Sequence, residues 1–121
     1  MQLARDGILQ SGATAAAPTL SYELFTNGIT IGTFRIYKNG TLYTTLTTDT
    51  SLTTITLTAG DTFYATLQNS TPLQSGGSID YFLNGSFVTT YSIFSTATLT
   101  TPTVTSAAGN TYKYTANFGL A

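Results

Sequence analysis

From Leu20 onward, the chain consists of short segments in which apolar and polar residues alternate. β-branched and aromatic residues dominate these segments, and Gly, Asn, Asp or Ser separates them at intervals of roughly 8 to 12 residues, a spacing typical of antiparallel all-β domains. We therefore predict an all-β fold, an antiparallel β-sandwich over residues 20–121. The predicted strands are residues 20–25, 32–38, 41–47, 52–58, 62–68, 78–83, 86–93, 97–104 and 111–118.

Asn-Gly pairs mark three of the predicted turns. Both residues tolerate the positive φ of a type I′ turn, which makes this dipeptide the strongest short signal of a hairpin. The hairpin prediction applies above all to the second and third pairs, each of which lies between two strand-like segments. The three pairs are Asn27-Gly28, Asn39-Gly40 and Asn84-Gly85.

The alternation also predicts which side chains face the core, because successive residues of a strand point to opposite faces. Before the second Asn-Gly pair, Phe34 and Ile36 are expected inside, with Arg35 and Tyr37 outside. After the turn, one face is expected to hold Leu42, Thr44 and Leu46. The half-buried strand 111–118 is expected to close one sheet. The aromatic residues predicted to face inward are Phe34, Phe63, Phe87, Tyr112, Tyr114 and Phe118.

A faint internal repeat relates two parts of the domain. Residues 39–45 align with residues 84–90, and residues 59–66 align with residues 108–115. Two interpretations remain open: a duplication of about four strands linked by residues 69–77, or the repeated use of the few available turn chemistries in a Thr-rich β-protein. The second interpretation is favoured.

Residues 1–19 show neither alternation nor a helical period, and they contain an isolated Arg5-Asp6 pair among small residues. We interpret residues 1–19 as a flexible N-terminal arm ahead of the β domain. Asp6, Gln10 and Ser11 interrupt any apolar stretch of the length that a secretory signal needs. We therefore expect no signal peptide and synthesis in the cytoplasm.

Composition narrows the chemistry further. The chain has no His and no Cys, so it lacks the side chains that most often serve as base, nucleophile or soft metal ligand near neutral pH. Charged residues make up 7% of the chain and the net charge is −1, which leaves no basic surface for a nucleic acid. No segment is apolar enough to span a membrane. We expect no nucleic-acid partner, no membrane insertion and no disulfide.

The few carboxylates offer little for catalysis or metal binding. Asp49 and Asp61 lie in turn-like contexts, where a short acid commonly bonds nearby backbone amides, and Asp80 is expected to point outward. A calcium site needs about six oxygen ligands, and the chain does not cluster its acids. We expect no metal and no cofactor. A small hydrolase that uses two of the five acids is the least favoured alternative.

Aromatic residues on the outer side are the strongest candidates for recognition. The alternation places Tyr37, Tyr43 and Tyr64 on the more exposed side, where they are predicted to form a patch. Exposed Tyr is favoured at protein interfaces and in sugar-stacking platforms. A protein contact is the preferred interpretation, because the chain has no Trp, the residue that carbohydrate sites usually contain.

Taken together, the small-residue arm, the Thr-rich β domain, the Asn-Gly hairpins and the sparse charge resemble a bacteriophage virion structural protein. Residues 34–40, Phe-Arg-Ile-Tyr-Lys-Asn-Gly, followed by residues 57–62, Leu-Thr-Ala-Gly-Asp-Thr, are also similar to immunoglobulin-like modules of phage and bacterial surface proteins. The resemblance covers about the middle third of the chain. It implies an immunoglobulin-like or jelly-roll-like sandwich without the Cys and Trp of antibody domains.

The resemblance implies a non-enzymatic component of a virus particle, such as a capsid decoration, spike or minor capsid protein. Its expected partners are copies of itself and other virion proteins, and its expected location is the virion. The predicted interface combines the tyrosines with residues of the arm. The arm residues are Arg5, Ile8 and Leu9. The alternative is a carbohydrate-binding or adhesive module that contacts host glycans through the tyrosines or the loop 69–77.

Overall fold

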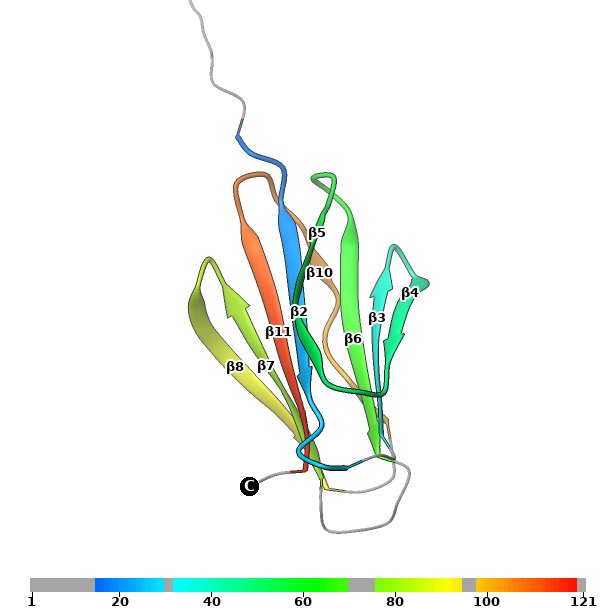
Figure 1. Ribbon diagram of the computed structural model, residues 1–121. Helices are drawn as coiled ribbons and strands as arrows, with labels where there is room; N and C mark the ends of the chain where they lie inside the picture. The colour runs from blue at the N-terminus through cyan, green and yellow to red at the C-terminus, as the bar shows by residue number, and fades with distance from the viewer. Residues whose placement is uncertain (1–14, 30–31, 70–75, 95–97, 120–121) are drawn as a thin grey trace, which may run out of the picture.

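The structure, a computed structural model, describes residues 15–29, 32–69, 76–94 and 98–119. Within these residues, ten strands form two five-stranded sheets that pack face to face, which confirms the predicted β-sandwich (Figure 1). The predicted loop 69–77 and the arm lie largely outside the described residues. The strands are β2 (Thr19–Phe25), β3 (Gly32–Lys38), β4 (Thr41–Leu46), β5 (Thr50–Thr56), β6 (Thr62–Asn69), β7 (Gly77–Leu83), β8 (Ser86–Ile93), β9 (Thr98–Thr100), β10 (Val104–Thr105) and β11 (Thr111–Phe118).

One sheet, here called the β11 sheet, has the order β5-β2-β11-β7-β8. The other, the β6 sheet, has the order β10-β6-β3-β4, and β9 also pairs with β6. All pairs are antiparallel except β2 with β11, which run parallel. The prediction that residues 111–118 close a sheet is wrong: β11 lies at the centre of its sheet, between β2 and β7. Alternation shows that a strand buries one face, but it does not identify the neighbours of that strand.

The core lies between the inner faces of the two sheets. Phe63 is fully buried and meets the rings of Tyr112 and Tyr114 edge-on, with ring centroids 5.0 and 5.8 Å apart. Edge-to-face pairs of this kind add about 0.5 to 1.5 kcal/mol beyond the burial of their area. The buried hydrophobic residues are Leu20, Tyr22, Leu24, Phe34, Ile36, Leu57, Phe63, Ala65, Leu67, Ile79, Tyr112, Tyr114, Ala116 and Phe118.

Five of the six aromatic residues predicted to face inward are buried, but Phe87 is 58% exposed. The reason is a β-bulge. Tyr81 pairs with Thr89, whereas Phe82 pairs with Phe87, so Val88 is an extra residue in β8. One extra residue reverses the faces of every residue beyond it.

The same irregularity occurs in the hairpin of β3 and β4. Ile36 pairs with Thr44, but Tyr37 pairs with Leu42, so Tyr43 is the extra residue in β4. The expectation that Leu42 shares a face with Thr44 and Leu46 is therefore wrong for Leu42, which lies opposite the outward-facing Tyr37.

The Asn-Gly turns have the backbone conformation that was predicted. In the hairpin β3–β4, Asn39 and Gly40 have φ values of 53° and 77°, and in the hairpin β7–β8, Asn84 and Gly85 have φ values of 52° and 82°. Asn27 also has a positive φ, but the turn at residues 27–28 lies between β2 and β3, which belong to different sheets. Only two of the three pairs therefore close a hairpin within the described residues.

A side-chain clamp holds the tip of the first hairpin. The Nδ2 atom of Asn39 donates to Oδ1 of Asp61 at 3.0 Å, and Oδ1 of Asn39 accepts from the backbone N–H of Thr62 at 2.9 Å. The backbone N–H of Asn39 donates to the carbonyl of Thr62. The turn residue thereby ties β3 to β6.

The second hairpin has the same clamp. The Nδ2 atom of Asn84 donates to Oδ1 of Asn110 at 3.1 Å, and Oδ1 of Asn84 accepts from the backbone N–H of Thr111 at 2.8 Å. With the matching bulges, this makes β7, β8 and β11 structural equivalents of β3, β4 and β6. The repeat therefore extends beyond shared turn chemistry to strand pairing, bulge position and side-chain contacts.

Close approach between the two sheets explains why β3 and β7 each begin with a glycine. A Cβ atom at Gly77 would lie 2.5 Å from Cδ2 of Leu67, and one at Gly32 would lie 2.8 Å from the ring of Phe118. Both positions are inner, buried ends of strands. A side chain at either position would push the sheets apart at this end of the sandwich.

The predicted strand 97–104 is two short strands, β9 and β10, with Thr101, Pro102 and Thr103 between them. Pro102 has no N–H and cannot continue a ladder, so the chain leaves the edge of β6 at this point. Thr101 bridges the gap: its backbone N–H donates to the carbonyl of Ala65, and its Oγ1 accepts from the N–H of Ala65 at 3.0 Å. The hydroxyl also lies 3.3 Å from the buried hydroxyl of Tyr114.

Candidate interaction surfaces

Two of the three predicted patch tyrosines meet on the outer face of the β6 sheet. Tyr37 and Tyr64 are cross-strand partners on β3 and β6, and their rings stack with centroids 4.7 Å apart and planes 7° apart. Leu42, the β4 partner of Tyr37, is 48% exposed beside them. These three residues, Tyr37, Leu42 and Tyr64, are called the first patch below.

Tyr43 does not join the first patch. As the extra residue of the β4 bulge, it has no partner in the register of β3 and β4. Burial raises the pKa of Tyr22, and the phenol of Tyr43 raises it further. Tyr43 is 47% exposed, and Leu42, not Tyr43, is the β4 partner of Tyr37.

The sequence reasoning missed an equivalent cluster on the β11 sheet. Phe82 on β7 faces outward, its β8 partner Phe87 meets it edge-on at 5.8 Å, and the Nζ atom of Lys113 on β11 lies 4.2 Å from the Phe82 ring centroid. These three residues, Phe82, Phe87 and Lys113, are called the second patch below. The internal repeat was a signal that could have located it, since Phe82 and Phe87 occupy the positions that correspond to Tyr37 and Leu42 in the first half of the repeat.

Sheet edges are a further surface for association, because an edge strand presents unpaired backbone groups. The edges at β4, β5 and β8 carry no charged residue. Each of them contains a bulge, which twists the edge and limits continuous pairing. The edge formed by β9 and β10 is protected in another way, by short strands and by Pro102.

The arm residues Arg5, Ile8 and Leu9 lie outside the described residues. The described chain begins at Ala15, and the first hydrogen bond that ties it to the sandwich runs from the N–H of Gly109 to the carbonyl of Ala16 at 2.7 Å. The carbonyl of Pro18 then accepts from Leu57. Residues 16–19 therefore belong to the folded sandwich, although the sequence assigned them to the arm.

The four carboxylates of the β domain each accept hydrogen bonds from other residues of the fold. Asp61 bonds Asn39 and the N–H of Thr58, Asp49 accepts from the N–H of Thr26 at 2.7 Å, and Asp80 accepts from Thr90 at 2.6 Å. Glu23 accepts from Thr115 at 2.8 Å. The hydrogen bond from Asn39, followed by that from Thr58, holds the pKa of Asp61 below its usual range. Lys38 lies 3.8 Å from Asp61 and adds a smaller effect in the same direction.

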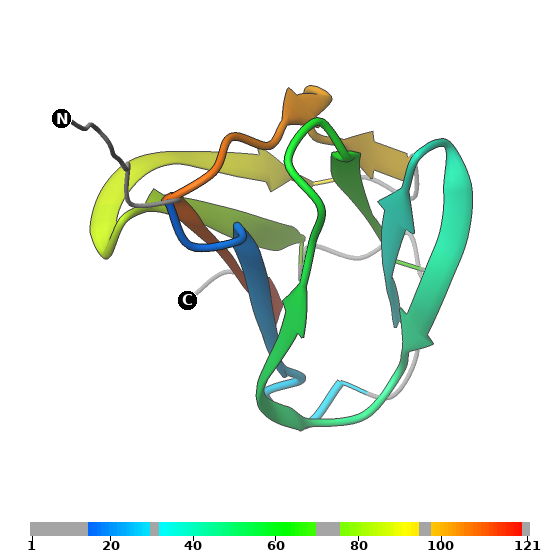
Figure 2. The same cartoon turned by 90° about the horizontal axis from the view of Figure 1, so that it is seen from above.

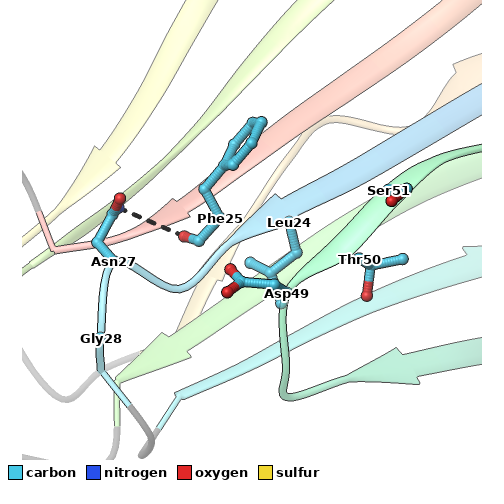
Figure 3. Close-up of a pocket in the computed structure, with 7 residues that line it drawn as sticks. All are labelled: Leu24, Phe25, Asn27, Gly28, Asp49, Thr50 and Ser51. Carbon is cyan, nitrogen blue, oxygen red and sulfur yellow. Dashed lines mark hydrogen bonds between the residues drawn. The ribbon is translucent and has the colours of Figure 1, made fainter.

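A shallow hollow of about 410 Å³ lies where β2 ends and β5 begins (Figure 3). Asp49 and Asn27 are its main polar side chains, and both are engaged with the backbone: Asp49 with Thr26, and Asn27 with the carbonyls of Phe118 and Phe25. Figure 3 shows the Phe25 ring pointing away from Asp49. The hollow therefore offers one solvent-exposed carboxylate and no convergent set of free polar groups. Its lining residues are Leu24, Phe25, Asn27, Gly28, Asp49, Thr50 and Ser51.

Residues 15–29, 32–69, 76–94 and 98–119 contain no group of three or more acids, His or Cys arranged to hold a metal ion. In the same part of the chain, no helix is long and apolar enough to cross a membrane.

No family model matches the chain, and no curated protein matches it. The crystal structure of the major pilin from Streptococcus pyogenes is similar at 12% identity, with a TM-score of 0.41 over 87% of this chain and 48% of the pilin. A single-residue mutant of that pilin gives a TM-score of 0.42 at 12% identity over 92% of this chain and 51% of the other. The chain thus spans about half the length of the pilin.

Proposed function

We propose that this chain is a non-enzymatic structural component of a virus particle, which assembles by protein–protein contacts with copies of itself and with other virion proteins. The observation that carries the proposal is the pair of outward-facing apolar patches on a domain whose surface has very little charge. Leu42 and Phe87 are 48% and 58% exposed, and each lies in a cluster with aromatic neighbours. Clustered apolar exposure is typical of a surface that a partner covers.

Low charge supports the same proposal. A net charge of −1 provides little of the repulsion that normally keeps small domains apart. Thr and Ser cover much of the outer surface and cost little side-chain entropy when a contact forms. A protein of this kind is suited to close packing with neighbours rather than to a dispersed, monomeric existence.

The N-terminal arm is proposed as an attachment element. Arg5, Ile8 and Leu9 would contact a neighbouring subunit, since a segment without a core of its own gains structure by binding. The anchoring of Ala16 and Pro18 fixes where such a segment leaves the sandwich, which is beside the turn at Gly109.

The glycan-binding alternative receives less support from the geometry of the tyrosines. A sugar-stacking platform needs an aromatic face that is open to solvent. In the stack of Tyr37 on Tyr64, each ring already covers one face of the other. Tyr43, which was expected to complete the platform, lies elsewhere.

The test is the solution mass of residues 1–121 beside a chain that lacks residues 1–14, measured by sedimentation velocity. The deletion ends at residue 14 because Ala16 and Pro18 bond to the sandwich. A full-length Ile8→Ser, Leu9→Ser double variant is the matched control, since it keeps the length of the arm. We expect a defined oligomer for the intact chain and a smaller species for both altered chains. Glycan binding by a chain that is monomeric in every form would contradict the proposal.

A further inference from the structure

We infer that the two outward patches are the two halves of one contact between copies of this chain, in which the second patch of one copy docks on the first patch of the next. This inference rests on the proposed assembly function and names the surface that performs it. In the contact, the ammonium of Lys113 reaches the Tyr37–Tyr64 pair of the neighbouring copy, and Phe87 packs against Leu42.

The first argument is the equivalence of the two patches. Each lies near the tip of a hairpin with an Asn-Gly turn. Each combines an aromatic residue on the first strand of the hairpin with its half-exposed apolar partner on the second strand, in the pair between the turn and the bulge. Each aromatic residue is also in contact with the outward residue of the adjoining strand, Tyr64 in one case and Lys113 in the other. The core needs neither cluster, because both lie outside it.

The second argument is position. Both hairpin tips point to the same end of the sandwich (Figure 1), and in the view from above they lie at opposite flanks, with β7–β8 on one side and β3–β4 on the other (Figure 2). One copy can therefore hold two neighbours at once without a clash between them. A contact that joins unlike surfaces in this way repeats from copy to copy and gives a ring or an open filament.

The third argument is charge. The second patch contains the ammonium of Lys113, whereas the three residues of the first patch are uncharged and the nearby Asp61 is already paired with Lys38. Two second patches would bring two ammonium groups together, which is unfavourable. Docking a second patch on a first patch instead places Lys113 over the one open face of a ring in the Tyr37–Tyr64 stack, a favourable cation–π contact worth about tenfold or more in affinity where water is excluded.

The test uses two full-length variants, Leu42→Asp in the first patch and Phe87→Asp in the second. Both positions are about half exposed, so both variants are expected to fold. Leu52→Asp is the matched control, because Leu52 on β5 is 53% exposed and belongs to neither patch. Circular dichroism and a urea unfolding curve verify the fold of each variant, and sedimentation velocity gives the mass.

We expect the intact chain and Leu52→Asp to form oligomers, and Leu42→Asp and Phe87→Asp to be monomeric when alone. Mixed together, the two monomeric variants are expected to form a one-to-one dimer and nothing larger, because Leu42→Asp retains a second patch and Phe87→Asp retains a first patch. This restored dimer is an outcome that general loss of solubility or of folding would not produce.

Three outcomes overturn the inference. If Phe87→Asp abolishes association and Leu42→Asp does not, second patches bind each other. If neither substitution changes the mass of an oligomeric intact chain, the copies associate elsewhere, and the proposed assembly function stands without these patches. If the intact chain is monomeric, copies make no contact through either patch, and binding of the arm to other virion proteins then decides the proposed function.

Discussion

The hydroxyl of Thr101 links β6 to the core tyrosine Tyr114, and its removal gives a specific stability prediction. The side chain is 3% exposed, its Oγ1 accepts the N–H of Ala65 at 3.0 Å, and it lies 3.3 Å from the hydroxyl of Tyr114. Replacing Thr101 by Val keeps the shape of the side chain and removes the oxygen. The N–H of Ala65 on β6 is then left without a partner, and so is the Tyr114 hydroxyl, whose burial raises its pKa well above the usual value.

The magnitude follows from those two groups. An unsatisfied buried N–H costs about 1 to 3 kcal/mol, and the loss of the longer hydroxyl contact adds on the order of 0.5 kcal/mol. Burial of the additional methyl group of Val offsets part of this loss of stability, so we expect Thr101→Val to lower the free energy of unfolding by about 2 kcal/mol. With a urea dependence of about 1.5 kcal/mol per molar, the midpoint of unfolding should fall by about 1.3 M.

The assay is a urea unfolding curve followed by circular dichroism, with Thr101→Ser as the control. Ser keeps the oxygen and loses a methyl group, which costs about 0.8 kcal/mol. Tyr114→Phe should also cost less in the Thr101→Val background than in the intact chain, since the orphaned hydroxyl is gone. An unchanged midpoint for Thr101→Val, or an equal loss for Ser and Val, would refute the bridging role.

Two further predictions concern the hairpin clamp and the sheet contact. Because hydrogen bonds from Asn39 and Thr58 lower the pKa of Asp61, its ionised form stabilises the fold above the ordinary pKa of about 4, and this contribution is lost as the pH falls through the lower folded pKa. Asp61→Asn should therefore make unfolding midpoints less dependent on pH between about 2 and 5, and a variant with unchanged pH dependence would contradict the clamp. Gly77→Ala should lower the free energy of unfolding by about 1 to 3 kcal/mol, measured by thermal unfolding, since its Cβ would lie 2.5 Å from Leu67 Cδ2. An unchanged free energy of unfolding would show that the two sheets can separate enough there to admit a methyl group.

Local chemistry explains which parts of the fold could be predicted from the sequence. Alternation identified the buried faces of β3, β6 and β11, because each of these strands has one face in the core and one outside it. The Asn-Gly turns were predictable because few residues adopt positive φ without strain. The bulges have no comparable local signal, so Leu42 and Phe87 were assigned to the wrong face, and the second patch was missed.

Long-range pairing was beyond local reasoning. The central position of β11 and its parallel pairing with β2 depend on residues separated by 92 positions, as in the contact of Thr115 with Glu23. Nothing in the alternation of either strand distinguishes a central strand from an edge strand. The split at Pro102 was readable in principle, since proline ends a ladder, but the apolar and Thr-rich flanks favoured a continuous strand.

The parallel pairing of β2 with β11 has a mechanical consequence. The described chain enters at one end of the sandwich and leaves at the other (Figure 1). A pulling force between these two ends therefore slides β2 along β11, and the seven register pairs that join the strands bear the load together. A hairpin such as β7–β8, pulled apart at its open end, would instead unzip one pair at a time. As the first and last of the described strands, β2 and β11 therefore resist extension of the chain by shear along their shared length.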